Sequence, residues 1–139
     1  MINFYGENDF ELENKNDFSR WIEKVIYSEE KKLDEISFIF CNDEYLHKIN
    51  LQYLNHDTFT DIISFDNTVG NLLGGDIFIS TDRVAENAMD YNVDFDEELK
   101  RVIIHGVLHL CGYKDKSESE SALMRQKENE KMELFHVEQ

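Results

Sequence analysis

Apolar and polar residues alternate or recur along this chain with the periods of short strands and amphipathic helices. Segments in which β-branched and aromatic residues gather or alternate with polar ones predict strands at residues 2–5, 36–41, 62–65 and 75–79. Apolar residues spaced three or four positions apart predict helices that begin near residues 17, 43, 81, 95 and 118. This order favours an α+β fold, in which about five helices pack on a mixed sheet of about four strands.

Capping residues mark the starts of the later helices. Ser117 and Glu120 have the spacing of a capping box, which predicts a last helix from about residue 118 to 135. Asp94 with Glu97 forms a similar opening for the helix before it. The two helices nearest the C-terminus therefore have defined starts.

Length and composition are those of one globular domain over residues 1–139. The chain is 41% hydrophobic and 12% aromatic, which is enough apolar material for a core despite 32% charged residues. No run approaches the length of about 18 apolar residues that crosses a bilayer, and the N-terminus lacks the pattern of a secretion signal. We therefore expect a cytoplasmic protein with no membrane partner, in which Cys41 and Cys111 are reduced and buried.

The net charge of −16, from 14 basic against 30 acidic residues, counts against nucleic-acid binding. A field of that sign repels polyanions, and DNA is not an expected partner. Screening at physiological salt confines surface fields to about 8–10 Å, so a local basic groove can still overcome the repulsion. The charge therefore lowers the expectation of a nucleic-acid partner without excluding one.

The strongest chemical signal is the pair His105 and His109. Two imidazoles four residues apart on a helix lie on one face and can bind a single divalent cation. The residues around them are apolar, so the pair is expected at a buried surface, where an unpartnered imidazole is costly. With 5 His in the chain, such a spacing arises by chance in roughly one chain in seven, so the spacing alone is weak. A metal ion would supply the missing partner.

The turn after this helix offers a third ligand. Gly112 suits the left-handed position at which a helix ends, so the chain is expected to reverse there. Asp115 is the candidate by position, and a carboxylate oxygen binds zinc at about 2.0–2.2 Å. Three protein ligands leave room for a water molecule.

Gly106 argues against a peptidase. Zinc peptidases of this helix type carry a glutamate directly after the first histidine as general base, and glycine cannot take a proton. A metal site without that base still polarises a phosphoryl oxygen and lowers the pKa of bound water toward about 7. Cleavage of a phosphodiester fits this set of groups, with water or an RNA 2′-hydroxyl as the nucleophile.

Several segments together carry a family resemblance. They are the run from His105 to Tyr113, the downstream Met124 and Glu128, and the strands at residues 60–65 and 75–77. In combination they resemble the YbeY family of bacterial endoribonucleases and 16S ribosomal RNA maturation factors. The resemblance implies a zincin-like α+β fold, a zinc ion, and a role in 16S rRNA 3′-end processing and ribosome quality control. It implies ribosomal RNA and the ribosome as partners.

Two positions depart from the family pattern. The family's third ligand is normally a histidine, and Asp115 stands there in this chain, which implies an altered metal affinity or preference. His56 and His136 are alternative third ligands. The family usually carries a basic residue where this chain has Leu54, so the phosphate-binding residue is left unassigned.

Thr60, Asp61 and Ser64 bracket an apolar strand and are the candidate substrate-binding residues beside the metal. Residues of these types at strand ends more often serve turns or caps. The family resemblance increases the weight of a substrate-binding role for them. Asp76 is a candidate acceptor that orients a ligand histidine, with a simple turn role as the alternative.

The sequence predicts a metal-dependent endoribonuclease of single-stranded RNA. The catalytic residues are His105, His109 and Asp115, which hold one Zn²⁺ or another divalent cation. Two other functions stay open: a ribosome-associated metalloprotein with a structural ion that binds a ribosomal protein or a GTPase, and a hydrolase of another substrate, including a weak peptidase. A structural ion would be fully coordinated by protein, whereas a catalytic ion keeps an exchangeable water.

Overall fold

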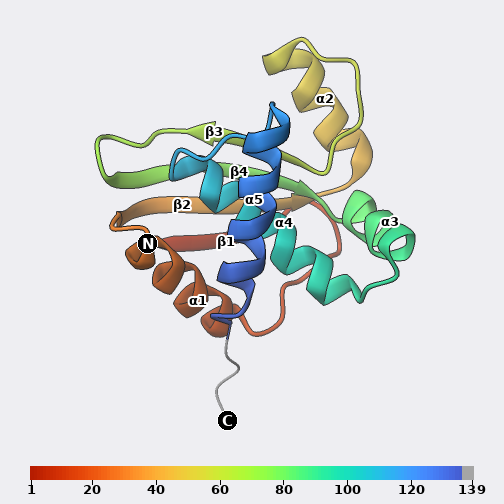
Figure 1. Ribbon diagram of the computed structural model, residues 1–139. Helices are drawn as coiled ribbons and strands as arrows, with labels where there is room; N and C mark the ends of the chain where they lie inside the picture. The colour runs from red at the N-terminus through yellow and green to blue at the C-terminus, as the bar shows by residue number, and fades with distance from the viewer. Residues whose placement is uncertain (136–139) are drawn as a thin grey trace.

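The computed structural model describes residues 1–135, and four strands within them form one mixed sheet (Figure 1). The strands are β1 (Ile2–Gly6), β2 (Lys32–Cys41), β3 (Ile62–Asp66) and β4 (Leu72–Ser80). They lie in the order β1-β2-β4-β3; β1 and β4 run parallel to β2, and β3 runs antiparallel to β4. The predicted mixed sheet is confirmed.

Five helices accompany this sheet in the described part of the chain, which is the predicted number, and α5 packs on α4 rather than on the sheet. They are α1 (Lys15–Ser28), α2 (Asp43–Leu54), α3 (Thr81–Tyr91), α4 (Phe95–Leu110) and α5 (Glu118–Met132). Figure 1 shows α5 in front with α4 behind it, α1 at the lower left below the strands, and α2 at the upper right. Ile77 and Ile79 of β4 belong to the main core with α1 and α4, whereas Phe78 between them packs with α2 on the other face. No helix of residues 1–135 is long and apolar enough to cross a membrane.

Some predicted helix and strand boundaries are confirmed, and others differ from those in the structure. Ser117 caps α5 with the full capping box, because its hydroxyl accepts from the Glu120 N–H while the Glu120 carboxylate accepts from the Ser117 N–H. Asp94 occupies the cap position of α4 without a side-chain hydrogen bond. α5 ends at Met132 rather than near residue 135, and β2 begins at Lys32 rather than at residue 36. Lys32 and Leu33 join the sheet because they pair with Leu72 and Leu73 at the start of β4, and the register shifts between Leu33 and Ile36.

The two cysteines are free thiols, as predicted. Cys41 is buried, but Cys111 is only partly buried, so the prediction that both are buried is wrong for Cys111. Burial raises the pKa of each thiol to about 12, which keeps both protonated and unreactive at neutral pH.

α4 lies directly on β3 and β4, and Gly106 permits this close approach. A Cβ atom at Gly106 would lie 2.8 Å from Ile62 Cδ1 and 3.2 Å from Ile77 Cδ1. Position 106 therefore faces the apolar sheet. A glutamate at this position, as in zinc peptidases, would point into the core rather than toward His105 and His109.

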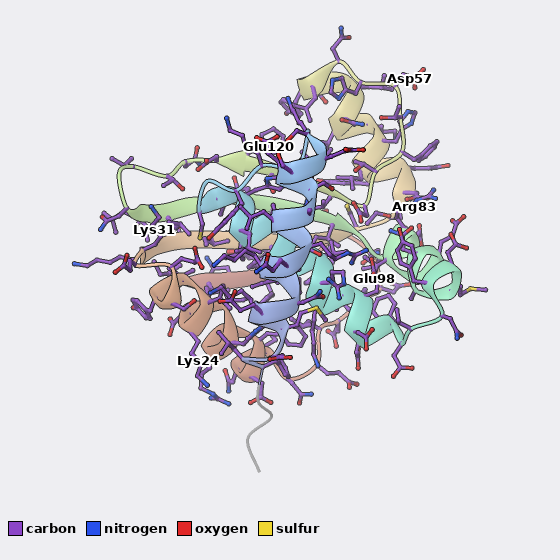
Figure 2. The ribbon with its side chains drawn as sticks, viewed as in Figure 1. Lys24, Lys31, Asp57, Arg83, Glu98 and Glu120 are labelled. Carbon is purple, nitrogen blue, oxygen red and sulfur yellow. The ribbon has the colours of Figure 1, made fainter. Side chains whose placement is uncertain are left out.

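Charged side chains surround these layers (Figure 2). Lys24 points outward from α1, and Asp57 lies beyond the end of α2. Glu98 of α4 is an exception, because it is only 5% exposed. Its burial raises the pKa of its carboxyl group, as does the charge of Asp61. Glu98 and Asp61 line the same cavity as His105.

Candidate metal centre

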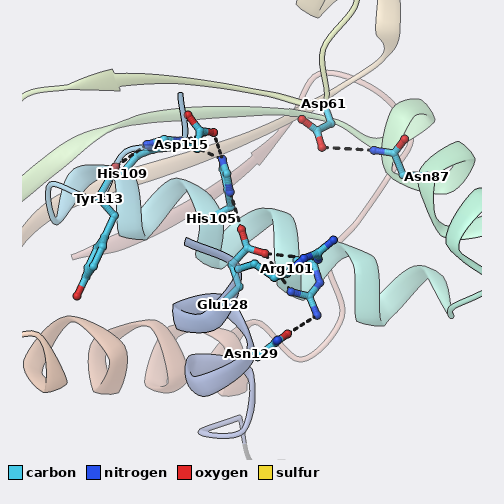
Figure 3. A network of polar contacts seen from close by, with 10 residues as sticks. Asp61, Asn87, Arg101, His105, His109, Tyr113, Asp115, Glu128 and Asn129 are labelled. Carbon is cyan, nitrogen blue, oxygen red and sulfur yellow. Dashed lines mark hydrogen bonds and ion pairs between the residues drawn. The ribbon is translucent and has the colours of Figure 1, made fainter. Parts of the chain in front are cut away.

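The three predicted ligands converge at the end of α4 and in the turn that follows it (Figure 3). The Nε2 atoms of His105 and His109 lie 2.9 Å apart. The Asp115 Oδ2 atom lies 3.2 Å from the His105 Nε2 atom and 3.4 Å from the His109 Nε2 atom. Two imidazoles and one carboxylate therefore point at a common position. We call these three residues the metal group.

The second nitrogen of each imidazole fixes the tautomer of its ring. His105 Nδ1 lies 2.6 Å from the Glu128 carboxylate, and His109 Nδ1 lies 2.9 Å from the Tyr113 carbonyl oxygen. An ionised carboxylate and a carbonyl only accept hydrogen bonds, so both Nδ1 atoms carry the proton. In a neutral ring with its proton on Nδ1, the Nε2 atom carries a lone pair. The two Nε2 lone pairs then face each other and the Asp115 carboxylate oxygen. Three electron-rich atoms at these distances require a cation or a proton between them.

The separations within the metal group suit a divalent cation. Zinc binds imidazole nitrogen at about 2.0–2.1 Å and carboxylate oxygen at about 2.0–2.2 Å in tetrahedral sites, which places neighbouring ligand atoms about 3.3–3.5 Å apart. The observed separations of 2.9, 3.2 and 3.4 Å are close to that range. The donor set therefore fits the cation with small side-chain adjustments.

Glu128 of α5 is the carboxylate that orients His105. Its side chain is 7% exposed, and it also accepts from the Arg101 guanidinium at 3.0 Å. Burial raises the pKa of Glu128, but the hydrogen bonds from His105 and Arg101 outweigh burial and bring the pKa below its ordinary value. Burial lowers the pKa of His105, but the bond to Glu128 and the charges of Asp115 and Asp61 bring it above its ordinary value. The environment therefore increases the basicity of His105 as a ligand.

Tyr113 holds the turn that carries Asp115. Gly112 adopts a φ of 107°, in the left-handed region that favours glycine, and the predicted end of the helix there is confirmed. The Tyr113 N–H donates to the Leu108 carbonyl oxygen at 3.1 Å. The Tyr113 hydroxyl donates to Glu29, just after α1, at 2.6 Å. The turn is therefore tied to α4 through its backbone and to α1 through a side chain.

A cavity of about 650 Å³ opens beside the metal group, and all three members of that group line it. The predicted substrate-binding residues Thr60, Asp61 and Ser64 line it as well. The Ser64 hydroxyl has no hydrogen bond within residues 1–135, so it is available to a ligand. The structure therefore brings these three residues and the metal group to one cavity.

A second cavity of about 320 Å³ adjoins the first and shares Asp61, His105 and Asp115 with it. Burial raises the pKa of Asp61, and the Asn87 side chain donates to its carboxylate at 3.4 Å, as Figure 3 shows. Arg101 and Arg125 line this smaller cavity. Their guanidinium nitrogens lie 3.0 and 3.7 Å from Glu128, so both positive charges are directed at a protein carboxylate.

The other residues singled out in the sequence have different outcomes. His56 lines the larger cavity but is not part of the metal group, and His136 lies outside the described residues. Leu54 lines the same cavity as His56. The prediction that Asp76 orients a ligand histidine is wrong, because Asp76 is an exposed residue of β4 and Glu128 accepts from His105 instead.

Glu128 is the site residue whose role the sequence does not reveal. It lies four residues after the buried Met124, on the face of α5 that packs against α4. An acidic residue on the apolar face of a helix is a signal of a buried partner. The signal does not identify His105 as that partner.

The fold and the site define a small α+β protein with a candidate metal centre beside an open cavity. A family model described as Endoribonuclease YbeY matches residues 4–136. The chain belongs to the Endoribonuclease YbeY family. A relative named Endoribonuclease YbeY from Christiangramia forsetii is 68% identical over 99% of this chain and 96% of its own length. One from Flavobacterium johnsoniae is 63% identical over 100% of both chains.

A solved structure supports the same fold. The solution structure of TM1509 from Thermotoga maritima matches with a TM-score of 0.69 and 26% sequence identity. The match covers 97% of this chain and 89% of that one. The arrangement of helices on the sheet is therefore shared with a protein of much lower sequence similarity.

Proposed function

We propose that this chain is a metal-dependent endoribonuclease that cleaves single-stranded RNA in 16S ribosomal RNA 3′-end maturation and ribosome quality control. Its membership of the Endoribonuclease YbeY family supports cleavage of RNA phosphodiester bonds. The observation that carries the proposal is the convergence of three electron-donating atoms beside an open cavity. Ribosomal RNA and the ribosome are the proposed partners, with a ribosomal protein or a GTPase as the protein partner.

His105, His109 and Asp115 would hold the cation, which we assign as Zn²⁺ because two imidazoles and a carboxylate suit zinc. Asp115 is a harder ligand than imidazole, so the site is also compatible with other divalent cations. A bound cation supplies Lewis acidity, which polarises a phosphoryl oxygen and activates water or an RNA 2′-hydroxyl for attack on phosphorus. No fourth His, Cys, Asp or Glu joins the group within residues 1–135, which favours an open coordination position over a structural ion.

The residues of the larger cavity provide the contacts to RNA. The Ser64 hydroxyl can donate to a phosphate oxygen or accept from a ribose hydroxyl. The Thr60 hydroxyl donates to the Ile62 carbonyl oxygen at 3.4 Å, so it can accept from a ribose hydroxyl. The Asp61 carboxylate can accept from a ribose 2′-hydroxyl, which distinguishes RNA from DNA. These three side chains share the cavity with the metal group, so a bound phosphodiester can meet both.

The test combines metal analysis with RNA cleavage by the purified chain and its His109→Ala and Asp115→Ala variants. We expect about one zinc ion per wild-type chain and loss of zinc in both variants. Both variants are expected to cleave single-stranded RNA at least about 100-fold more slowly than the wild type. Lys48→Ala is the matched control, because this exposed lysine of α2 lines neither cavity. RNA cleavage that His109→Ala leaves unchanged would contradict the proposal.

A further inference from the structure

We propose that His56 binds an RNA phosphate in the larger cavity and so supplies a phosphate contact beside the metal group. The inference rests on the proposed function, because it takes RNA as the substrate. His56 lies in the segment between α2 and β3, and it lines the same cavity as the metal group. Three observations carry the inference: the ordered backbone around His56, its unpaired ring, and the charge of the cavity.

Hydrogen bonds hold the chain on both sides of His56. The His56 N–H donates to the Asn50 carbonyl oxygen at 3.1 Å, directly after α2 ends. The next side chain, Asp57, accepts from the His47 ring at 2.8 Å, and Figure 2 shows Asp57 beyond the end of α2. The Asn50 side chain also donates to the Thr58 carbonyl oxygen at 2.9 Å. This part of the segment is already ordered, so binding a ligand there costs little additional conformational entropy.

The imidazole of His56 has no partner of its own within residues 1–135. No hydrogen bond, ion pair or ring contact there involves this side chain, although Asp57 and Thr58 beside it are both bonded. The His56 side chain is exposed where it lines the cavity. A fixed backbone that presents an unused donor to a cavity is the arrangement expected of a ligand-binding residue.

The charge around the cavity favours such a donor. The lining carboxylates are Asp61, Asp66 and Asp115. The chain as a whole carries a net charge of −16, which opposes the approach of RNA. Apart from the metal group, His56 and Lys116 are the basic residues of the lining. The arginines of the smaller cavity are already directed at Glu128.

The experiment measures kcat and KM of the zinc-loaded chain on a short fluorescein-labelled single-stranded RNA. His56→Ala is expected to raise KM about tenfold, the effect of losing one charge-assisted hydrogen bond, with little change in kcat. Zinc content and the urea midpoint of unfolding are expected to match the wild type. Lys48→Ala removes a positive charge from α2 outside both cavities and is expected to leave KM unchanged.

Two rescue variants distinguish a phosphate contact from a merely structural role. His56→Lys keeps a basic N–H donor at the same position and is expected to hold KM within about threefold of the wild type. Leu54 lines the same cavity, so Leu54→Arg in the His56→Ala background is expected to recover most of the lost affinity. A structural role for His56 would not be restored by a cation at position 54.

The outcomes separate this inference from the proposed function. If the wild-type chain does not cleave the RNA, the proposed function fails and this inference fails with it. If the wild type cleaves and His56→Ala has an unchanged KM, only this inference is overturned. Loss of zinc in His56→Ala would also overturn it, because His56 would then be a metal ligand. Raised KM with both rescues supports it.

Discussion

Atoms on the far side of each imidazole decide whether the metal group can form. The Glu128 carboxylate and the Tyr113 carbonyl oxygen take the Nδ1 protons, which leaves the Nε2 lone pairs for a cation. Arg101 in turn donates to Glu128 at 3.0 Å, so the buried carboxylate is paired on two sides. The metal group therefore depends on residues that do not themselves bind the ion.

Replacing Glu128 with alanine is expected to weaken zinc binding by about 10–100-fold. The His105 ring loses the acceptor that fixes its tautomer, and Arg101 loses its buried partner. Competition with a chromophoric zinc chelator measures the affinity. Glu133→Ala is the control, because Glu133 is an exposed glutamate just after α5. A zinc affinity of Glu128→Ala within threefold of the wild type would show that Glu128 does not orient the ligand.

Substitutions at Gly106 test whether this face of α4 packs on the sheet. Gly106→Ala is expected to change the free energy of unfolding by no more than about 1 kcal/mol, because the end methyl of Ile62 can rotate away and alanine favours the helix. Gly106→Glu is expected to cost more than about 3 kcal/mol, because it places an unpaired charge against Ile62 and Ile77. Urea unfolding measures both. Equal stability of the two variants would mean that position 106 faces solvent.

At the scale of helices and strands, the sequence predicts what is local along the chain. The capping box of Ser117 and the pair His105 and His109 are recognisable because their atoms lie within four residues of one another. The start of β2 at Lys32 cannot be recognised in this way, because Lys32 and Leu33 join the sheet by pairing with Leu72 and Leu73 of β4, which lie far along the chain. The partnership of Glu128 with His105 depends on how α5 crosses α4, and no spacing in the sequence encodes that crossing.

Glu29 joins three elements around the metal turn. It follows α1, accepts from the Tyr113 hydroxyl at 2.6 Å, and pairs with Lys131 of α5 at 2.9 Å. The Glu29 and Lys131 side chains are only 12% and 4% exposed. Burial raises the pKa of Glu29, but the bonds from Tyr113 and Lys131 outweigh burial and bring the pKa below its ordinary value of 4.5. The ionised form of Glu29 therefore stabilises the packing of α1, α5 and the turn.

The lowered pKa of Glu29 predicts how stability depends on pH. Its contribution is fully present above the unfolded value of 4.5 and is lost as the pH falls through the lower folded value. Glu29→Gln is therefore expected to lower the free energy of unfolding by about 2–3 kcal/mol at pH 7, and by progressively less below pH 4.5. Urea unfolding over this pH range measures the difference, with the exposed Glu13→Gln as control. A difference that persists undiminished in acid would mean that the Glu29 charge is not what stabilises the fold.

At the scale of the whole molecule, charge and function oppose each other. The chain carries a net charge of −16, yet its proposed substrate is a polyanion. The repulsion acts over the whole surface, whereas the attraction from the metal group, His56 and Lys116 acts only within the larger cavity. Salt screens the long-range repulsion more than the short-range attraction, because the Debye length falls from about 30 Å at 0.01 M to about 10 Å at 0.1 M.

This balance predicts an unusual salt dependence for a ribonuclease. Between about 0.01 M and 0.1 M monovalent salt, kcat/KM for a short single-stranded RNA is expected to rise a few-fold, because the approach of RNA is repelled less. Replacing the exposed Glu13, Glu44 and Glu133 with glutamine removes negative charge outside both cavities and is expected to flatten that rise. If kcat/KM instead falls steadily with salt, as it does for proteins that bind nucleic acid through a basic surface, attraction at the cavity outweighs the field of the whole chain.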